Sequence, residues 1–258
     1  MSTLTDQLRA LGDVRAPASL LGIVLERVAL GDAYAALDTP IGRAFVAFSR
    51  DGISAVRLDA DRASFEAAFR RLHGRPVRRT DELPAPLVRR VTRALGDGDG
   101  RGLQYDLRGL TEFERAVLRK ALEIPRGEVR TYAWVAREIG HPAAVRAVGS
   151  ALRRNPVPIL IPCHRVVRSD GSVGQYALGA SAKEQILSAE GLPIQPSGRV
   201  TERGMRYLGS DSTHIYCFPS CRHARRVTPR HRVPFADARS AAAAGYRPCR
   251  VCRPALAS

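Results

Sequence analysis

The chain has 258 residues, 45% of them hydrophobic, which is enough for one large domain or two to three small ones. Its formal net charge of +16 comes almost wholly from arginine, and this favours an anionic partner, nucleic acid first and a membrane surface second. No apolar run reaches the ~18 to 20 residues that span a bilayer, and the N-terminus lacks a charged-then-apolar leader. We therefore expect a cytoplasmic protein without membrane contact.

The first part of the chain changes from helical to β-rich patterning. Residues 1–30 have leucine and valine at helical spacing, interrupted around Pro17, and we interpret them as an N-terminal helical arm. From residue 34 to 58 the pattern consists of short β-rich runs, Arg43–Phe48 and Ile53–Leu58, with a turn signal at Asp51-Gly52. These runs predict a sheet that contains a hairpin.

Two amphipathic helices are expected next, each stopped by a glycine. The first carries Phe65, Phe69 and Leu72 before Gly74, and the second carries Leu87, Val88, Val91 and Leu95 before Gly96. Together with the sheet they predict a small α/β subdomain over residues 31–107.

Residues 108–192 contain the signals of a helix-turn-helix. Thr111 and Glu114 form a capping box that opens a helix closed near Pro125. Two short helices are then expected, Tyr132–Ile139 and, after Gly140, Ala143–Arg153. The second presents small residues around one cation, which suits close approach to a DNA backbone; these residues are Ala143, Ala144, Ala147, Gly149 and Ser150, around Arg146. A small-residue helix packed in the core, with Arg146 extending to solvent, remains the alternative.

One cysteine stands apart from the other four. An apolar, strand-like run over residues 157–161 ends on Pro162 and delivers Cys163 beside His164, and a helix over 182–190 ends in Glu190. An imidazole held by a carboxylate can take the proton of a thiol, so these three residues form a sensible nucleophilic relay. A cysteine hydrolase, an acyltransferase and an inert buried cysteine are alternatives on this chemistry alone.

The tail has the spacing of a metal site. The pairs Cys217/Cys221 and Cys249/Cys252 are separated by one domain-sized loop, which is typical of a tetrahedral zinc centre in a reducing compartment. From residue 199 to the end, the sequence contains twelve arginines and only three acidic residues. We expect a linker over 193–206 and a four-cysteine zinc domain over 207–258, since so short a segment needs a metal to fold.

The motif around Cys163 resembles the active-site segment of the O6-alkylguanine-DNA alkyltransferases. The resemblance covers about residues 34–192 and is carried by Pro162-Cys163-His164-Arg165-Val166, with Arg146-Ala147-Val148-Gly149, Asn155-Pro156, Gly174-Gln175-Tyr176 and Lys183 through Glu190-Gly191. It implies a ribonuclease H-like α/β N-terminal subdomain and a mainly helical, winged-helix-like domain at 108–192 that binds DNA and transfers the alkyl group.

The resemblance implies a role for each matching residue. Cys163 would accept the alkyl group, His164 and Glu190 would activate it, and Asn155 would buttress the active-site turn. Tyr132 would aid nucleotide rotation and donate toward the guanine ring, and Arg146 would fill the gap left by the extruded base, on a DNA-binding surface with Ala144, Ala147 and Gly149. Tyr176 and Ala177 would line the base pocket.

The expected substrate is double-stranded DNA carrying O6-alkylguanine, with O4-alkylthymine or methylphosphotriesters as further substrates. A flipped guanine can transfer its methyl to Cys163, and the product thioether has no good leaving group, so each chain would react once. The protein is then a monomeric, nucleoid-associated bacterial repair protein. The alternatives are a non-catalytic DNA-binding sensor of alkylated bases and a cysteine hydrolase that turns over. Because Leu178 stands where many relatives have glycine, we expect weak acceptance of bulky adducts.

The tail resembles the zinc domain of the Ada adaptive-response proteins. The resemblance is carried by Ile215-Tyr216-Cys217-Phe218-Pro219-Ser220-Cys221 and by Gly245-Tyr246-Arg247-Pro248-Cys249-Arg250-Val251-Cys252-Arg253-Pro254. It implies a small α+β zinc domain whose Cys217 takes a methyl from a DNA phosphotriester; Thr213, Arg222, Arg225 and Arg226 are candidate phosphate contacts. Phe218 replaces a basic residue in this pattern, and structural zinc with nonspecific DNA binding is the alternative.

Overall fold

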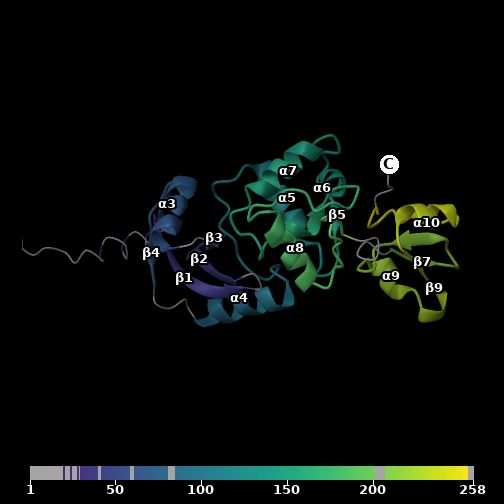
Figure 1. Ribbon diagram of the computed structural model, residues 1–258, viewed down its shortest axis with the longest axis horizontal. Coiled ribbons are helices and arrows are strands. Elements are labelled where there is room, and N and C mark those ends of the chain that lie inside the picture. The colour runs from purple at the N-terminus through teal and green to yellow at the C-terminus, as the bar shows by residue number, and fades with distance from the viewer. Residues whose placement is uncertain are drawn as a thin grey trace, which may run out of the picture.

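The computed structural model describes residues 30–39, 42–58, 61–80, 85–200 and 207–254, together with the single residues 20, 24 and 28. Three parts follow one another along the long axis, and each contains a sheet (Figure 1). The expected helical arm, residues 1–30, lies almost entirely outside the described residues. Among the helices of the described ranges, none has both the length and the apolar content to cross a membrane.

The N-terminal part is a four-stranded sheet in the order β3-β2-β1-β4. Its first three strands form an antiparallel meander, and β4 pairs parallel with β1. The strands are β1 (Asp32–Thr39), β2 (Gly42–Ser49), β3 (Gly52–Arg57) and β4 (Val77–Arg79), and the helices are α3 (Arg62–His73) and α4 (Ala85–Asp97). The predicted hairpin is therefore present, whereas β4 had no signal in the sequence.

Two expectations for these helices are wrong. Helix α4 continues through Gly96 to Asp97, and the left-handed glycine is Gly98 at φ 65°. Leu72, expected on the buried face of α3, is 61% exposed, because Phe65 and Phe69 already fill the contact with Tyr34 of β1.

A buried ion-pair network joins this sheet to the chain that follows it. Arg75 Nε donates to Asp32 Oδ1 (2.6 Å) and its Nη2 donates to Asp106 Oδ2 (2.5 Å), and both carboxylates are fully buried. Beside it, Tyr105 donates from its hydroxyl to the carbonyls of Gly100 and Leu160. Gly100 itself packs so closely on the Leu160 carbonyl that a Cβ would clash. The N-terminal part thereby supports the loop that precedes Cys163.

The central part is mainly helical. The predicted capping box is confirmed: the Thr111 hydroxyl accepts from the Glu114 amide, and Glu114 accepts from the Thr111 amide. Gly140 adopts φ 80° between α6 and α7, so the two short helices are joined by the expected glycine turn. The elements are α5 (Glu112–Leu122), β5 (Arg130–Thr131), α6 (Tyr132–Glu138), α7 (Val145–Arg153), the 3-10 helix η1 (Cys163–Arg165), β6 (Val166–Val167) and α8 (Ala180–Ala189).

The strand expected before Cys163 is wrong. Residues 157–162 form a buried loop with one isolated bridge between Pro158 and Ile161, and Ile159 adopts φ 74°. Proline has no amide to donate to a strand ladder, and this segment has a proline at 156, 158 and 162. Cys163 is therefore held at the end of a compact turn rather than at the end of a strand.

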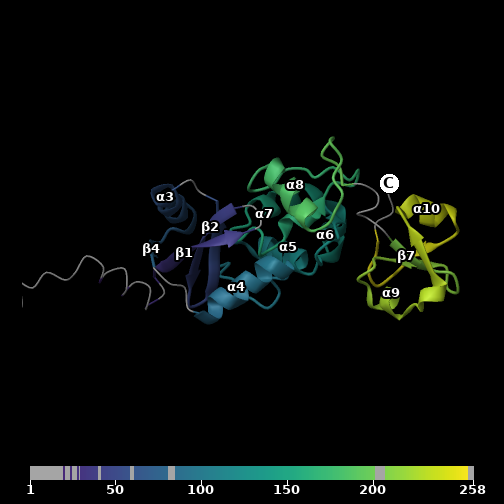
Figure 2. The ribbon, with the colours of Figure 1, turned by 60° about the horizontal axis from the view of Figure 1, so that its bottom comes forward.

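The C-terminal part is a second four-stranded sheet, in the order β10-β8-β7-β9, with short helices beside it. Figure 1 shows it beyond β5 and α6, and Figures 1 and 2 both show it at the opposite end of the molecule from the N-terminal sheet. Residues 193–200, assigned to the linker from the sequence, pack on the central part through Val200 and Ile194. The elements are β7 (Tyr207–Ser210), β8 (Ile215–Cys217), α9 (Arg222–Arg226), η3 (Pro229–His231), β9 (Arg232–Phe235), α10 (Ala238–Ala243) and β10 (Arg247–Pro248).

Candidate active site and metal centre

Cys163 is buried and is held by Asn155. Asn155 Nδ2 lies 3.0 Å from Cys163 Sγ and also donates to the Ile161 carbonyl, while its Oδ1 accepts from the Val157 amide. These bonds close the turn over residues 155–163. Asn155 therefore fixes both the loop and the thiol that the loop carries.

A buried carboxylate orients the histidine next to the thiol. His164 Nε2 lies 3.1 Å from Glu190 Oε1, and Glu190 also accepts from Arg165 (Nη2, 2.6 Å). His164 Nδ1 is buried and has no hydrogen-bond partner within the described part of the chain. The carboxylate therefore favours the tautomer with the proton on Nε2, which leaves the Nδ1 lone pair free to accept another proton.

The protonation states follow from burial. Burial raises the pKa of Cys163 to about 11, although the Asn155 hydrogen bond opposes this, so the resting group is a thiol. Burial lowers the pKa of His164 below 6.5, so the imidazole is neutral at pH 7. Burial alone would raise the pKa of Glu190, but the hydrogen bonds from His164 and Arg165 outweigh it and lower that pKa to about 2. The site therefore holds a thiol, a neutral base and a carboxylate.

Lys183 is a buried residue with no role predicted from the sequence. Its ammonium donates to the carbonyls of Val166 (2.6 Å) and Val173, and it lies 5.8 Å from the ring centroid of Tyr132. Burial lowers its pKa to about 8, and its charge lowers the pKa of Cys163. The available signal was a lysine on the apolar face of α8, in line with Ile186 and Leu187.

Some of the residues predicted to contact DNA line one cavity beside α7. A cavity of about 460 Å³ is lined by Tyr132, Arg146 and Gly149, together with Arg168 and Gln175. Arg146 and Ala147 are exposed and Ala144 and Gly149 are half-buried. This face of α7 is open, which argues against the alternative of a helix packed in the core.

The predicted base-pocket residues Tyr176 and Ala177 have different surroundings. Tyr176 is buried, with its ring edge-on to His164 at 6.2 Å between centroids. Ala177 is exposed and, with Leu178, Pro158 and Asn155, lines a cavity of about 360 Å³ between the N-terminal and central parts. Leu178 thus contacts the same cavity as the turn that holds Cys163.

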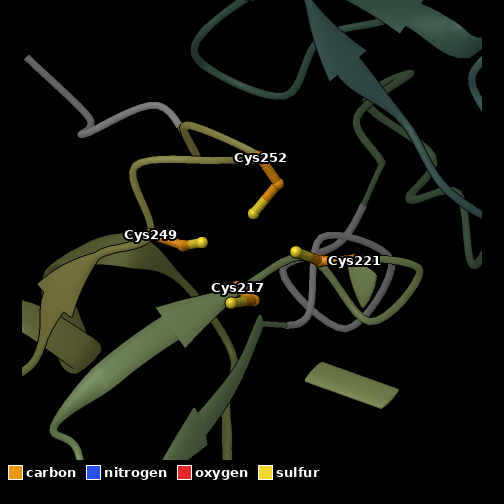
Figure 3. Close-up of side chains that lie close together, drawn as sticks. All are labelled: Cys217, Cys221, Cys249 and Cys252. Atoms are coloured by element: carbon orange, nitrogen blue, oxygen red, sulfur yellow. The ribbon is translucent and has the colours of Figure 1, made fainter. Parts of the chain in front are cut away.

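The four remaining cysteines converge on one point. Their Sγ atoms all lie within 4.8 Å of one another, and Figure 3 shows the sulfurs directed inward from the two knuckles, residues 217–221 and 249–252. Zinc bonds thiolate sulfur at about 2.3 Å and takes four ligands in a tetrahedron, so the donor set and its spacing fit this ion. The zinc centre predicted from the spacing is confirmed by this cluster together with the family match given below.

Fold and site together define the class of the protein: a DNA-binding protein whose chemistry is carried by one buried cysteine, with an added zinc domain. Residues 112–192 match the family model of the 6-O-methylguanine DNA methyltransferase DNA-binding domain, and residues 201–255 match the metal-binding domain of Ada.

Curated relatives agree with these matches. The chain is 35% identical to the mouse methylated-DNA–protein-cysteine methyltransferase over 69% of its own length and 88% of the relative. It is 40% identical to the Escherichia coli bifunctional transcriptional activator and DNA repair enzyme Ada, over 61% of this chain and 45% of that protein. The structure of the Mycobacterium tuberculosis O6-methylguanine methyltransferase is 30% identical, with a TM-score of 0.50 over 62% of this chain and 92% of that chain.

The chain belongs to the methylated-DNA–protein-cysteine methyltransferases, which repair DNA by moving a methyl group onto a cysteine of the protein. Its alkyltransferase-like fold and zinc-binding tail agree with this family. It spans less than half of Ada and of several of the other curated relatives that it matches.

We expect Glu190→Gln to slow methyl transfer about a hundredfold, because an imidazolium formed at His164 would lose its carboxylate. The wild-type rate should stay constant as the pH falls to 6.5 and decline only below it, since His164 must be neutral and burial lowers its pKa. Glu190 opposes that lowering, so the variant's decline should move to lower pH. Single-turnover rates across pH measure both effects, and a decline that moved above pH 6.5 would contradict the assignment.

Proposed function

We propose that Cys163 accepts an alkyl group from O6 of a guanine that has been flipped out of duplex DNA. The observation that supports this most directly is the geometry around Cys163: a thiol held by Asn155, beside a histidine whose Nδ1 is free and whose Nε2 is bound to Glu190. O4-alkylthymine is a second base substrate with the same reactive group.

In the proposed step, His164 takes the proton of the Cys163 thiol, directly or through a water. The thiolate attacks the alkyl carbon, an S–C bond forms and the C–O6 bond breaks, and the electron pair stays on the guanine oxygen. Tyr132, whose phenol is kept protonated by burial, donates toward the ring. The proton that His164 took from the thiol then passes through water to the guanine anion, so the products are an S-alkylcysteine and a neutral, repaired guanine. Each chain acts once because a thioether is not reversed by thiol chemistry.

Base flipping is assigned to α7. Extruding a nucleotide costs a few kcal/mol, and the cost is lower for a mispaired base. Arg146 is exposed on the open face of α7 and can occupy the vacated stack, with the small side chains of Ala144, Ala147 and Gly149 permitting close approach. We infer a monomer that acts in the bacterial cytoplasm at the nucleoid.

We also propose the finer fold assignments. The N-terminal sheet with α3 and α4 corresponds to a ribonuclease H-like subdomain over 31–107, and the central part to a winged-helix-like domain over 108–192. The linker of 193–206 begins with residues that pack on the central part, and the zinc domain is 207–258. The meander with its added parallel strand supports the first assignment, and the glycine-joined pair α6 and α7 supports the second.

Incubation with O6-methylguanine duplex should leave one methyl group per chain, on Cys163, and the reaction should then stop. Peptide mass spectrometry locates the group, and Cys163→Ala should lose it while DNA binding is retained. Methyl-free protein that still binds the lesion would support a sensor instead. Continued product formation beyond one equivalent would support a hydrolase.

Bulky adducts should react poorly because the Leu178 side chain fills space in a cavity that it lines together with Asn155, the residue that holds Cys163. We expect Leu178→Gly to raise the second-order rate with O6-benzylguanine about tenfold while leaving the O6-methylguanine rate unchanged. Competition between the two substrates measures the ratio. Comparable rates for both substrates in the wild-type protein would refute the prediction that Leu178 restricts the access of bulky adducts.

A second methyl acceptor is supported by a cavity at the zinc centre. A space of about 280 Å³ reaches Cys217 and is lined by Thr213, His223, Arg247 and Arg250. Arginine and a hydroxyl suit a phosphate ester, and zinc would keep the sulfur deprotonated and nucleophilic. Of the four candidate phosphate contacts, Thr213 lines this cavity, whereas Arg222, Arg225 and Arg226 on α9 do not.

Methylphosphotriester DNA should therefore methylate Cys217 in the zinc-loaded chain. Peptide mass spectrometry after incubation detects the modification, and Arg250→Ala should slow it about tenfold by removing a charged phosphate contact. The Cys163→Ala chain serves as the control, because its methylation at Cys217 should be unchanged. Unmodified Cys217 would leave structural zinc with nonspecific DNA binding as the role of this domain.

A further inference from the structure

The zinc domain docks on the central part through the zinc knuckles themselves. Phe218 and Ser220 lie between the ligands Cys217 and Cys221, and the third contact is the carbonyl of the ligand Cys252. All three contact β5, the start of α6, or Glu128 just before them. In Figure 1 the C-terminal part lies next to β5 and α6.

Arg130 is the buried centre of this interface. Its side chain is 5% exposed, and its guanidinium carbon lies 3.4 Å from the ring centroid of Phe218. Arg130 Nη2 donates to Glu128 Oε2 (2.6 Å) and to Ser220 Oγ (3.2 Å). Glu128 in turn accepts from the Ser220 amide (3.0 Å) and hydroxyl (2.9 Å). The Phe218 ring therefore makes a cation–π contact with the Arg130 guanidinium, whereas a basic residue at position 218 would repel it.

Trp134 forms the second half of the interface. Its indole Nε1 donates to the Cys252 carbonyl (3.1 Å), and its ring meets Phe218 edge-on at 6.4 Å between centroids. Only 7% of this large side chain is exposed. A second contact at the rim pairs Arg253 with Glu138 at 3.7 Å.

The contacted segment leads directly to the active site. Thr131 follows Arg130, caps α6 by accepting from the Trp134 amide, and precedes Tyr132. In β5, Arg130 and Thr131 pair with Val166 and Val167, which follow the Cys163–Arg165 turn. One short segment thus carries the zinc-domain contact on one side and Tyr132 on the other.

We propose that the zinc domain is an internal clamp on residues 128–134, and that zinc occupancy thereby holds Tyr132 in place for reaction at Cys163. A four-cysteine zinc site loses its shape without its metal, so Phe218, Ser220 and the Cys252 carbonyl would lose their alignment with Arg130 and Trp134. By reciprocity, docking also tightens zinc binding. Arg130 and Trp134 are positioning residues, and the link to Cys163 rests on the function proposed above.

The chain contains one tryptophan, Trp134, so its fluorescence reports the docked state. The test uses full-length, zinc-loaded Phe218→Ala and Glu128→Gln, which loosen the interface from opposite sides, with zinc content measured by metal analysis. Val251→Ala is the matched control, because Val251 lies between ligands of the other knuckle but is 47% exposed and outside the interface. We expect both interface variants to retain zinc and the fluorescence of Trp134 to shift to longer wavelength. Both variants should release zinc to a chelator about fivefold faster and react about fivefold more slowly at Cys163.

The outcomes separate the clamp from the proposed function. Emission, zinc release and reaction rate equal to wild type in both interface variants would overturn the clamp. A shifted emission with an unchanged Cys163 rate would overturn its link to the active site. Failure of the wild-type chain to take a methyl on Cys163 would instead refute the proposed function, while the fluorescence comparison would still decide whether the zinc domain is docked.

Discussion

The carboxylate of Glu190 is the group on which the active site depends. It sits at the C-terminal end of α8 and accepts from both His164 and Arg165. The same Arg165 donates to the carbonyls of Ile124 and Gly98, so one buried ion pair also joins the ends of α5 and α4 to the cysteine turn. A buried arginine without its carboxylate is costly. The charge that orients the base therefore also holds the surrounding elements together.

The protein keeps its thiols in two opposite environments. Cys163 is buried and rests as a thiol, and the unpartnered Nδ1 of the neighbouring His164 is the group proposed to take its proton. The four cysteines of the tail are gathered for a metal that keeps sulfur deprotonated. Protonation protects the first site from wasteful reaction before DNA binds, whereas the metal stabilises a segment too short to build a large core.

Much of this was readable from local sequence. The capping box at Thr111, the glycine turn at Gly140, the first hairpin and the zinc spacing depend on residues a few positions apart, and each is present. The failures have physical reasons. The apolar residues before Cys163 suggested a strand, but the prolines among them have no amide to donate to a strand ladder, so the segment is a loop. Gly96 suggested a helix end, but α4 continues through it to Asp97. No role was predicted for Lys183 because its role depends on the backbone carbonyls that surround its ammonium in the folded protein.

The sequence by itself determined the reactive cysteine motif, the paired metal ligands and the family they indicate, because these features are short patterns of chemically specific residues. Only the tertiary structure decided which groups become charged or neutral, since burial sets the protonation of Cys163 and His164, and the hydrogen bonds from His164 and Arg165 keep Glu190 ionised. It also decided that Phe218, an unexplained departure in a zinc motif, faces Arg130 from a segment far away in the chain. No local pattern encodes that contact, because it joins two residues that lie in different parts of the fold and far apart in the sequence.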